Sequence, residues 1–294
     1  MSSLRLSVVV PAFNESEALR DCLDSLNKQI DVIDEVVVVD NNSTDDTAAV
    51  VDGFAAASPK FRRVLAKDQG VIHARTKGFD SARGNVMARI DADSRVGPRW
   101  AQAIIDFFTE HGDTYDAGTG MCTSYDLPFQ AKFRESHRRL SEEAKGKLAS
   151  PEGSDLERLF GSNMAITKTA WEQARPFSCM RADVFEDLDL TLCLERNKAR
   201  IGLIPGADAT ISGRRFLTSV RPYFRYCMRD QRTYKVHGFP DRRRKAIFQM
   251  LLIAMPFYLI NWIPFRAYDP ATEKFTFAML RMPPENRPTP RAHR

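Results

Sequence analysis

The sequence predicts an α/β protein built on a mostly parallel sheet with helices on both faces. Residues 6–10 and 36–39 are β-branched or apolar almost throughout, which is typical of strands buried on both faces. Residues 15–29 and 46–57 follow them with apolar side chains at helical spacing. Two strand–helix units in succession favour parallel pairing of the strands.

Further elements continue this alternation along the chain. We expect Asn14 to cap the first helix, because asparagine is among the preferred N-cap residues. The later predicted segments are a strand at 62–66, a helix at 71–82, a strand at 85–90, a helix at 100–109, a strand at 117–123 and a helical stretch at 130–158.

Composition indicates a globular protein with a mild preference for anionic partners. The chain has 294 residues, 43% of them hydrophobic and 28% charged, with a net charge of +5. Nucleoside diphosphates, phospholipid headgroups and nucleic acid all fit that charge. Five scattered cysteines without a C-x-x-C pair argue against a disulfide framework or a zinc site. The first apolar stretch is too short for a secretory signal, so we expect a cytoplasmic protein.

Asp91 and Asp93 stand one residue apart, directly after the predicted strand at 85–90. Side chains at i and i+2 of a strand point to the same side, so both carboxylates enter one small volume. Like charges this close repel unless a cation lies between them. A divalent ion held by carboxylates and phosphate oxygens is the natural occupant, whereas an isolated D-x-D is more often a solvated turn.

The context of this pair favours a binding site. Polar clusters at 11–15, 40–43 and 91–93 each follow a predicted parallel strand. Ligands of open α/β sheets bind outside the carboxyl ends of the strands. We therefore expect the three clusters to converge on one crevice.

Taken in order, these segments resemble family-two glycosyltransferases, which are inverting sugar transferases of the GT-A fold. The order and spacing agree over about residues 6–215. The matching segments are Val8–Glu15, Val38–Asp45, Gly70–Arg75, Ile90–Asp93, Gly161–Ala165 and Phe185–Leu190.

The resemblance implies a nucleotide-sugar donor, UDP- or GDP-linked, and transfer with inversion at the anomeric carbon. Arg75 is expected to contact the nucleotide or its phosphates, although a solvated helix face explains an arginine there equally well. A turn-capping role is the alternative for Asp40. The residues that the resemblance assigns to the base and ribose are Pro11, Ala12, Asn14, Glu15 and Asp40.

The same resemblance implies a metal ion, Mg²⁺ or Mn²⁺, and a catalytic base. Asp93 is expected to bind the metal directly, whereas Asp91, with Ala92 between them, contacts the ribose or acts indirectly. His237 would complete the metal shell, although a lone histidine is more often structural. Among the acids at 186–187, Asp187 would be the base that activates the acceptor hydroxyl and Glu186 an orienting acid, on what is also an acidic helix start.

Two other functions remain open at this stage. Sugar-phosphate nucleotidyl transfer needs a glycine-rich loop after the first strand, and residues 11–15 contain no glycine. A non-catalytic nucleotide-sugar-binding protein of the same fold would be expected to lose Asp93 or Asp187, and both are present. Nucleic-acid binding is disfavoured because basic and aromatic residues do not interleave except near the tail, where membrane chemistry explains them equally well.

Beyond residue 216 we predict a helical, membrane-associated appendage. Residues 246–265 carry no charge, and basic residues flank both ends. A helix pair lying at the membrane surface fits best, with Trp262, Tyr258 and Phe257 at headgroup depth. A buried helix, a dimer contact and a true span remain open, and so does the oligomeric state.

The predicted domains are a catalytic domain at 1–215, the helical region at 216–265 and a basic, proline-rich tail at 266–294. Peripheral attachment to the inner face of the cell membrane would make a lipid-linked acceptor attractive. The segment 231–236 departs from the Gln-Arg-x-x-Arg-Trp motif of processive members, with Lys235 and Val236 at its end. We therefore expect transfer of a single sugar.

Overall fold

The computed structural model describes residues 4–150 and 153–283 and divides into two compact units. The first unit contains the residues up to 122, then 135–182 and 186–211. The second contains 123–134, 183–185 and the residues from 212 onward. The predicted domain boundaries stay a prediction, and part of the predicted tail lies outside the described residues.

A seven-stranded, mostly parallel sheet forms the centre of the first unit. Its strands β3, β2, β1 and β4 are mutually parallel, and β8 runs antiparallel to both β4 and β6. This confirms the predicted fold class. In sheet order the strands are β3 (Phe61–Leu65), β2 (Glu35–Asp40), β1 (Leu6–Ala12), β4 (Val86–Ile90), β8 (Asn163–Thr167), β6 (Ala117–Thr119) and β9 (Ile201–Leu203).

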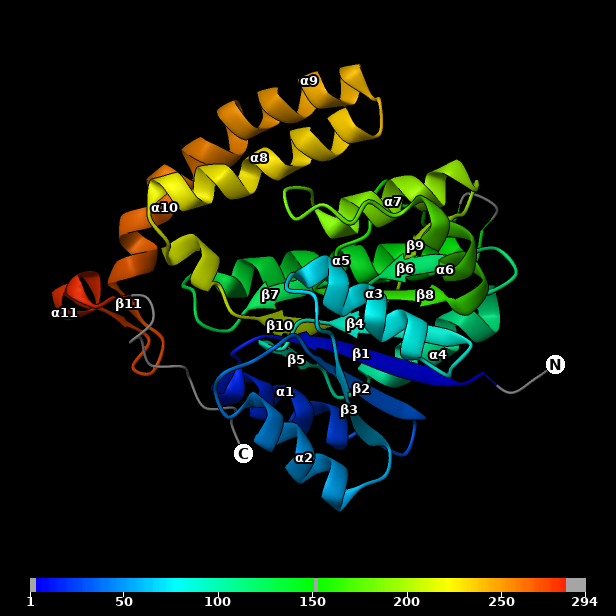
Figure 1. Ribbon diagram of the computed structural model, residues 1–294. Helices are drawn as coiled ribbons and strands as arrows, with labels where there is room; N and C mark the ends of the chain where they lie inside the picture. Colours follow the sequence, from blue (N-terminus) through cyan, green and yellow to red (C-terminus); the bar gives the residue numbers. More distant parts are fainter. Residues whose placement is uncertain (1–3, 151–152, 284–294) are drawn as a thin grey trace. The chain divides into compact units, whose positions relative to one another are not determined.

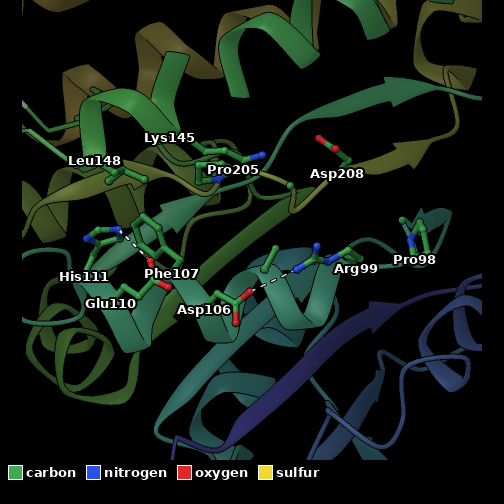
Figure 2. A pocket seen from close by; sticks show the side chains of 14 residues that line it. Pro98, Arg99, Asp106, Phe107, Glu110, His111, Lys145, Leu148, Pro205 and Asp208 are labelled. Carbon is green, nitrogen blue, oxygen red and sulfur yellow. Dashed lines mark ion pairs between the residues drawn. The ribbon is translucent and has the colours of Figure 1, made fainter. Parts of the chain in front are cut away.

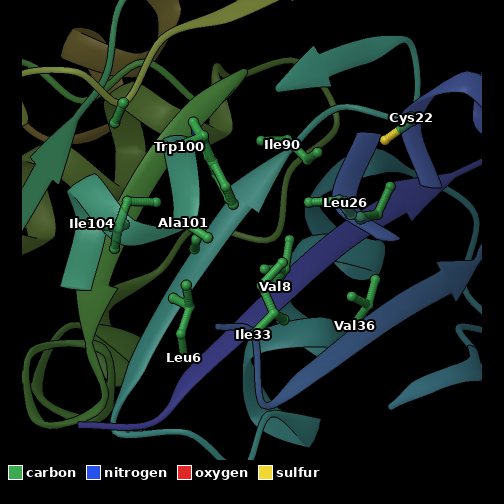
Figure 3. Packing of buried hydrophobic residues seen from close by; sticks show 14 of the residues in the cluster. Leu6, Val8, Cys22, Leu26, Ile33, Val36, Ile90, Trp100, Ala101 and Ile104 are labelled. Carbon is green, nitrogen blue, oxygen red and sulfur yellow. The ribbon is translucent and has the colours of Figure 1, made fainter. Parts of the chain in front are cut away.

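Helices cover both faces of this sheet, as the uniformly apolar strands require (Figure 1). Alternation along β1 sends Val8 and Val10 into one core and Val9 into the other. Figure 3 shows the first core, in which Val8 and Val36 pack near side chains such as Leu26. The first face carries α1 (Ser16–Asn27), α2 (Thr47–Ala57) and α4 (Trp100–His111), and the second carries α3 (Val71–Ser81), α6 (Lys168–Ala174) and α7 (Glu186–Arg196).

Shorter elements complete the first unit and lead into the second. The strand β5 (Ser94–Val96) pairs antiparallel with β10 (Ala209–Ile211). The predicted strand at 117–123 forms two strands, β6 and β7 (Cys122–Ser124). The helix α5 (Gln130–Leu148) ends ten residues before the predicted limit of 158, because Pro151 disfavours a helical conformation at the residue before it.

The second unit is mainly helical. Its elements in chain order are a 3₁₀ turn (Arg214–Leu217), α8 (Val220–Val236), α9 (Pro240–Gln249), a π-helical stretch (Met250–Ala254), α10 (Met255–Ala267), β11 (Tyr268–Asp269), β12 (Lys274–Phe275) and α11 (Phe277–Arg281). Among the described residues, Pro240–Ala267 is one continuous helical run, long and apolar enough to cross a membrane by length and composition. Only 22% of its most apolar window is buried.

Aromatic side chains hold this helical run against the segment before α8. Tyr258 is 1% exposed, stacks on Tyr223 with ring centroids 3.9 Å apart, and donates to the Thr218 carbonyl at 2.6 Å. The expectation that Tyr258 lies at headgroup depth is therefore wrong, because its ring and hydroxyl are both satisfied inside the unit. Trp262 also donates to the Thr218 carbonyl, at 3.0 Å, whereas Phe257 is 41% exposed.

The close approach of α3 to the sheet depends on a glycine. A Cβ atom on Gly78 would lie 2.3 Å from Val9 Cγ1 and 3.0 Å from Val39 Cγ2. We expect Gly78→Ala to lower the free energy of unfolding by about 1–3 kcal/mol, because overpacking outweighs the better helix propensity of alanine. Urea denaturation measures this change.

Gly53, in the middle of α2, is the matched control, because a Cβ there meets nothing within 4 Å. Gly53→Ala should raise stability by about 0.5–1 kcal/mol. A Gly78→Ala protein as stable as the wild type would contradict the packing described for α3.

Candidate active site

Parallel pairing brings the ends of three strands to one edge of the sheet. Ala12 at the end of β1 is the register partner of Asp40 at the end of β2. On the other side of β1, Val9 pairs with Arg89 of β4, and Asp91 follows that strand directly. The clusters that the sequence places after these strands are thus neighbours along one edge.

The loop after β2 is held by its own polar side chains. Asp40 is buried; its Oδ1 accepts from the Ser43 backbone N–H at 3.0 Å, and its Oδ2 lies 3.8 Å from Arg63. Asn41 accepts from the Gly70 N–H at 2.7 Å and donates to the Ala66 carbonyl at 2.9 Å. One carboxylate oxygen of Asp40 therefore stabilises the turn after β2. The contact of Asp40 with a nucleotide base or ribose stays a prediction.

Asn14 does not cap α1, contrary to the prediction. The N-cap position is Glu15, which makes no side-chain cap bond. Asn14 has a φ of 52°, and its side-chain oxygen accepts from the Thr44 N–H at 2.8 Å. This left-handed conformation turns the side chain toward the loop after β2, so Asn14 joins the β1 and β2 loops.

The end of β4 carries the two aspartates. Ala92 and Asp93 are both buried, at 4% and 8% exposure. Burial raises the pKa of Asp91, Arg89 works against this rise, and Glu186 and Asp187 add to it. Acids from β4 and α7 therefore lie within electrostatic reach of each other.

Arg89 connects these two groups of acids directly. It is a residue of the buried strand β4, and its guanidinium donates to Asp91 Oδ1 at 2.8 Å and to Glu186 Oε1 at 3.0 Å. Arg89 is not among the site residues that the sequence predicts. The available signal was a charge inside an otherwise apolar strand, because a buried arginine requires an anionic partner.

The acidic pair begins α7. Asp187 Oδ1 accepts from the Leu188 N–H at 2.7 Å and lies 3.3 Å from Arg158, while its Oδ2 accepts from the Gly161 N–H at 3.3 Å. Burial raises the pKa of Glu186, but Arg89 and Arg75 outweigh it, so the net shift is downward. Asp187 is therefore part of a helix start and contacts Gly161 of the motif at 161–165. Its role as the catalytic base stays a prediction.

Arg75 is fully buried, which excludes the solvated helix face considered for it. Its NH1 atom donates to the backbone carbonyl of Glu186. Within the described part of the chain, its Nε and NH2 atoms have no hydrogen-bond partner. Burial lowers the pKa of Arg75 to about 10. A contact with the nucleotide stays a prediction.

His237 is the C-cap residue of α8, in the second unit. Its role as a metal ligand stays a prediction.

A separate pocket of about 590 Å³ opens between α4, the end of α5 and the loop at 205–208 (Figure 2). Its charged side chains include Asp106, Glu110 and Asp208 against Arg99 and Lys145. This excess of acids disfavours a diphosphate. None of the site residues predicted from the sequence is among its lining residues.

Solved structures with the same arrangement of strands and helices are glycosyltransferases, and the chain has their GT-A fold. One is the mannosyltransferase PcManGT from Pyrobaculum calidifontis, in complex with GDP-Man and Mn²⁺, at a TM-score of 0.59 and 19% identity over 95% of this chain and 78% of that one. Another is Staphylococcus aureus TarS 1-349, at a TM-score of 0.57 and 16% identity over 88% of this chain and 79% of that one.

The family is shown by the sequence. The family model "Glycosyl transferase family 2" matches residues 7–168, more than half of the chain. The protein therefore belongs to this family.

Curated relatives match shorter stretches of the chain. The glycosyltransferase YibD of Escherichia coli (strain K12), uncharacterized by its name, is 28% identical over 37% of this chain and 32% of its own length. The glycosyltransferase AglE of Haloferax volcanii is 29% identical over 40% of this chain and 36% of its own length. The chain thus spans about a third of the length of these relatives.

Proposed function

We propose that this protein transfers one sugar from a UDP- or GDP-sugar to an acceptor hydroxyl or phosphate, with inversion. In a single displacement the acceptor oxygen forms a bond to the anomeric carbon while the bond to the diphosphate breaks. Asp187 takes the acceptor proton, since a carboxylate opposite the leaving group is what inversion requires. The nucleoside diphosphate leaves with the bonding electron pair.

The observation that carries this proposal is the bridge from Arg89 to Asp91 and Glu186. Arg89 and Glu186 lie 97 residues apart in the chain. The contact brings the start of α7 to the end of β4. A base on α7 and a metal-binding acid after β4 would then face one bound sugar diphosphate.

The residues after β4 fit a divalent cation. Asp93 is a buried carboxylate two residues beyond Asp91, just after β4. Carboxylate oxygens are the ligands that Mg²⁺ and Mn²⁺ prefer. A bound ion would bridge the diphosphate and offset the charge that develops on it. We assign Asp93 as the direct ligand and His237 as an additional one.

For the donor, we assign the loop at 11–15 and Asp40 to the base and ribose, with Asp91 and Ala92 beside them. We also assign Arg75 to the donor, because within the described residues its Nε and NH2 atoms have no hydrogen-bond partner. The solved neighbours include complexes with GDP-Man and with UDP. We therefore propose that the donor nucleotide is either GDP or UDP.

Nucleotide binding tests the donor class. We expect either UDP or GDP, together with Mn²⁺, to raise the melting temperature of the wild-type protein. At 100 times Kd the stabilisation is about 2.7 kcal/mol, or of order 5 °C for a chain of this size. Asp93→Ala should abolish the metal-dependent part, whereas Asp106→Ala, an acid of α4, should keep it. An equal response to every nucleotide, or none, would contradict the proposal.

Asp187→Asn tests the base. The amide keeps the size of the side chain and an oxygen for the Leu188 N–H, but it cannot accept a proton. We expect the rate of nucleotide release from the donor sugar, with water as acceptor, to fall by about 10²–10⁴-fold. Nucleotide binding by thermal shift should persist. Asp106→Asn is the matched control, and equal rates for the two variants would remove Asp187 from this role.

We also propose that the helical run Pro240–Ala267 lies on the inner surface of the cell membrane. Its exposed apolar side chains include Leu252, Ile253, Ile260 and Ile263, at 58%, 63%, 74% and 59% exposure. Basic residues at 242–245 precede them on α9. An apolar helix face next to a cationic segment fits an anionic lipid surface. A lipid-linked acceptor would then be within the enzyme's reach.

Flotation with vesicles tests this surface. We expect the protein to float with phosphatidylglycerol-containing vesicles and Ile260→Glu to bind them at least about tenfold more weakly, because burying an isoleucine contributes about 1.5–3 kcal/mol. Leu140→Glu introduces the same charge at an exposed position of α5 and should bind normally. Unchanged flotation of Ile260→Glu would contradict a membrane contact, and a concentration-dependent dimer disrupted by Ile260→Glu would indicate an interface between copies.

A further inference from the structure

An arginine occupies the middle of the sheet where an apolar side chain is expected. All five residues of β4 are buried, and this strand pairs with β1 on one side and β8 on the other. The side chain of Arg89 is only 2% exposed. A guanidinium in that position costs several kcal/mol unless anionic partners compensate it. Arg89 must therefore be satisfied by specific contacts.

Two acids from different elements supply those contacts. Asp91, just beyond β4, accepts from NH2, and Glu186, at the start of α7, accepts from NH1. The side chain of Glu186 is itself only 12% exposed. One cation thus joins the loop that carries Asp93 to the helix that carries Asp187.

A second buried arginine holds the same helix start from its main chain. Arg75 donates to the carbonyl of Glu186, whereas Arg89 holds the carboxylate of that residue. Side chain and backbone of Glu186 are therefore fixed by groups from two different elements, α3 and β4. The first turn of α7 has little freedom to move along the sheet edge.

The space for Arg89 is created by Gly161. A Cβ atom there would lie 2.3 Å from Arg89 NH1 and 3.2 Å from Asp187 Cβ. The Gly161 N–H also donates to Asp187. Gly161, in the segment before β8, thus leaves room for the Arg89 guanidinium, and its N–H orients the carboxylate of Asp187.

We propose that Arg89 is a positioning residue of the glycosyl-transfer reaction, setting the place of Asp187 relative to Asp93. This inference rests on the roles proposed above for those two acids. With its side chain only 2% exposed, Arg89 has almost no surface to offer to a donor or acceptor.

Loss of the guanidinium has separable consequences. Asp91 and Glu186 would then repel each other, so the start of α7 moves away from β4 and Asp187 loses its position. A misplacement of about 1 Å at a reacting group can cost about 100-fold in rate. Removing a positive charge makes the surroundings of Asp93 more negative, so divalent cations should bind at least as tightly.

Arg89→Met tests this inference, since methionine removes the charge and keeps an unbranched chain. The turnover number for donor hydrolysis should fall about 100-fold, while KM for the donor changes by less than about threefold. Binding of Mn²⁺ in the presence of UDP or GDP, followed by the electron paramagnetic resonance signal of the free ion, should not weaken. Arg89→Lys, which keeps the charge, should recover part of the rate.

Two further variants separate positioning from folding. Arg89→Met with Glu186→Gln removes both charges of the bridge and should be no slower than Arg89→Met alone, because the two residues act as one unit. If Arg89→Met alone does not fold, the turnover number of this double variant tests the positioning role of Arg89. Arg62→Met breaks the Arg62–Glu35 pair, 2.8 Å long, at the amino end of β2. It should lose stability and keep its turnover number.

The outcomes distinguish this inference from the proposed function. A folded Arg89→Met protein with a turnover number within threefold of the wild type would overturn the positioning role alone. So would parallel loss of Mn²⁺ binding and rate, which indicates a merely structural residue. A wild-type protein that binds no nucleotide with Mn²⁺ would overturn the proposed function and this inference with it.

Discussion

Burial of a guanidinium inside β4 is the constraint on which the candidate site depends. Arg89 cannot stay in the sheet without anions, so Asp91 and Glu186 both close on it. Because Glu186 is the first residue of α7, the helix start is drawn to the end of β4. Asp187 follows in the chain and is oriented by Gly161 and Arg158. A single charge requirement thus assembles acids from distant segments.

Parallel strand pairing supplies the frame for this assembly. The strand–helix units return each strand in the same direction, so the carboxyl ends of β1, β2 and β4 share one edge. Helices on both faces bury the uniformly apolar strands. The polar loops can then be irregular, as the left-handed Asn14 shows, because the sheet rather than the loops holds their ends.

In the helical run of the second unit, Tyr258 is buried whereas several aliphatic side chains are exposed. Tyr258 and Trp262 use their polar atoms on the Thr218 carbonyl, which ties the helical run to the segment before α8. Aliphatic residues such as Ile260 and Ile263 stay exposed. This exposed apolar face, next to the basic segment at 242–245, is the basis of the lipid contact proposed above.

The sequence by itself determined the fold class, the order of the elements and the family, because uniform apolar runs and helical spacing are local signals. It also placed acids at 91–93 and 186–187, but it did not show that Arg89 joins them. A local pattern cannot identify a contact between residues that lie 97 positions apart in the chain. The run at 246–265 is apolar on every side, so its periodicity could not tell buried Tyr258 from exposed Ile260. Only the tertiary structure decided these points, because burial and charge pairing depend on which elements pack together.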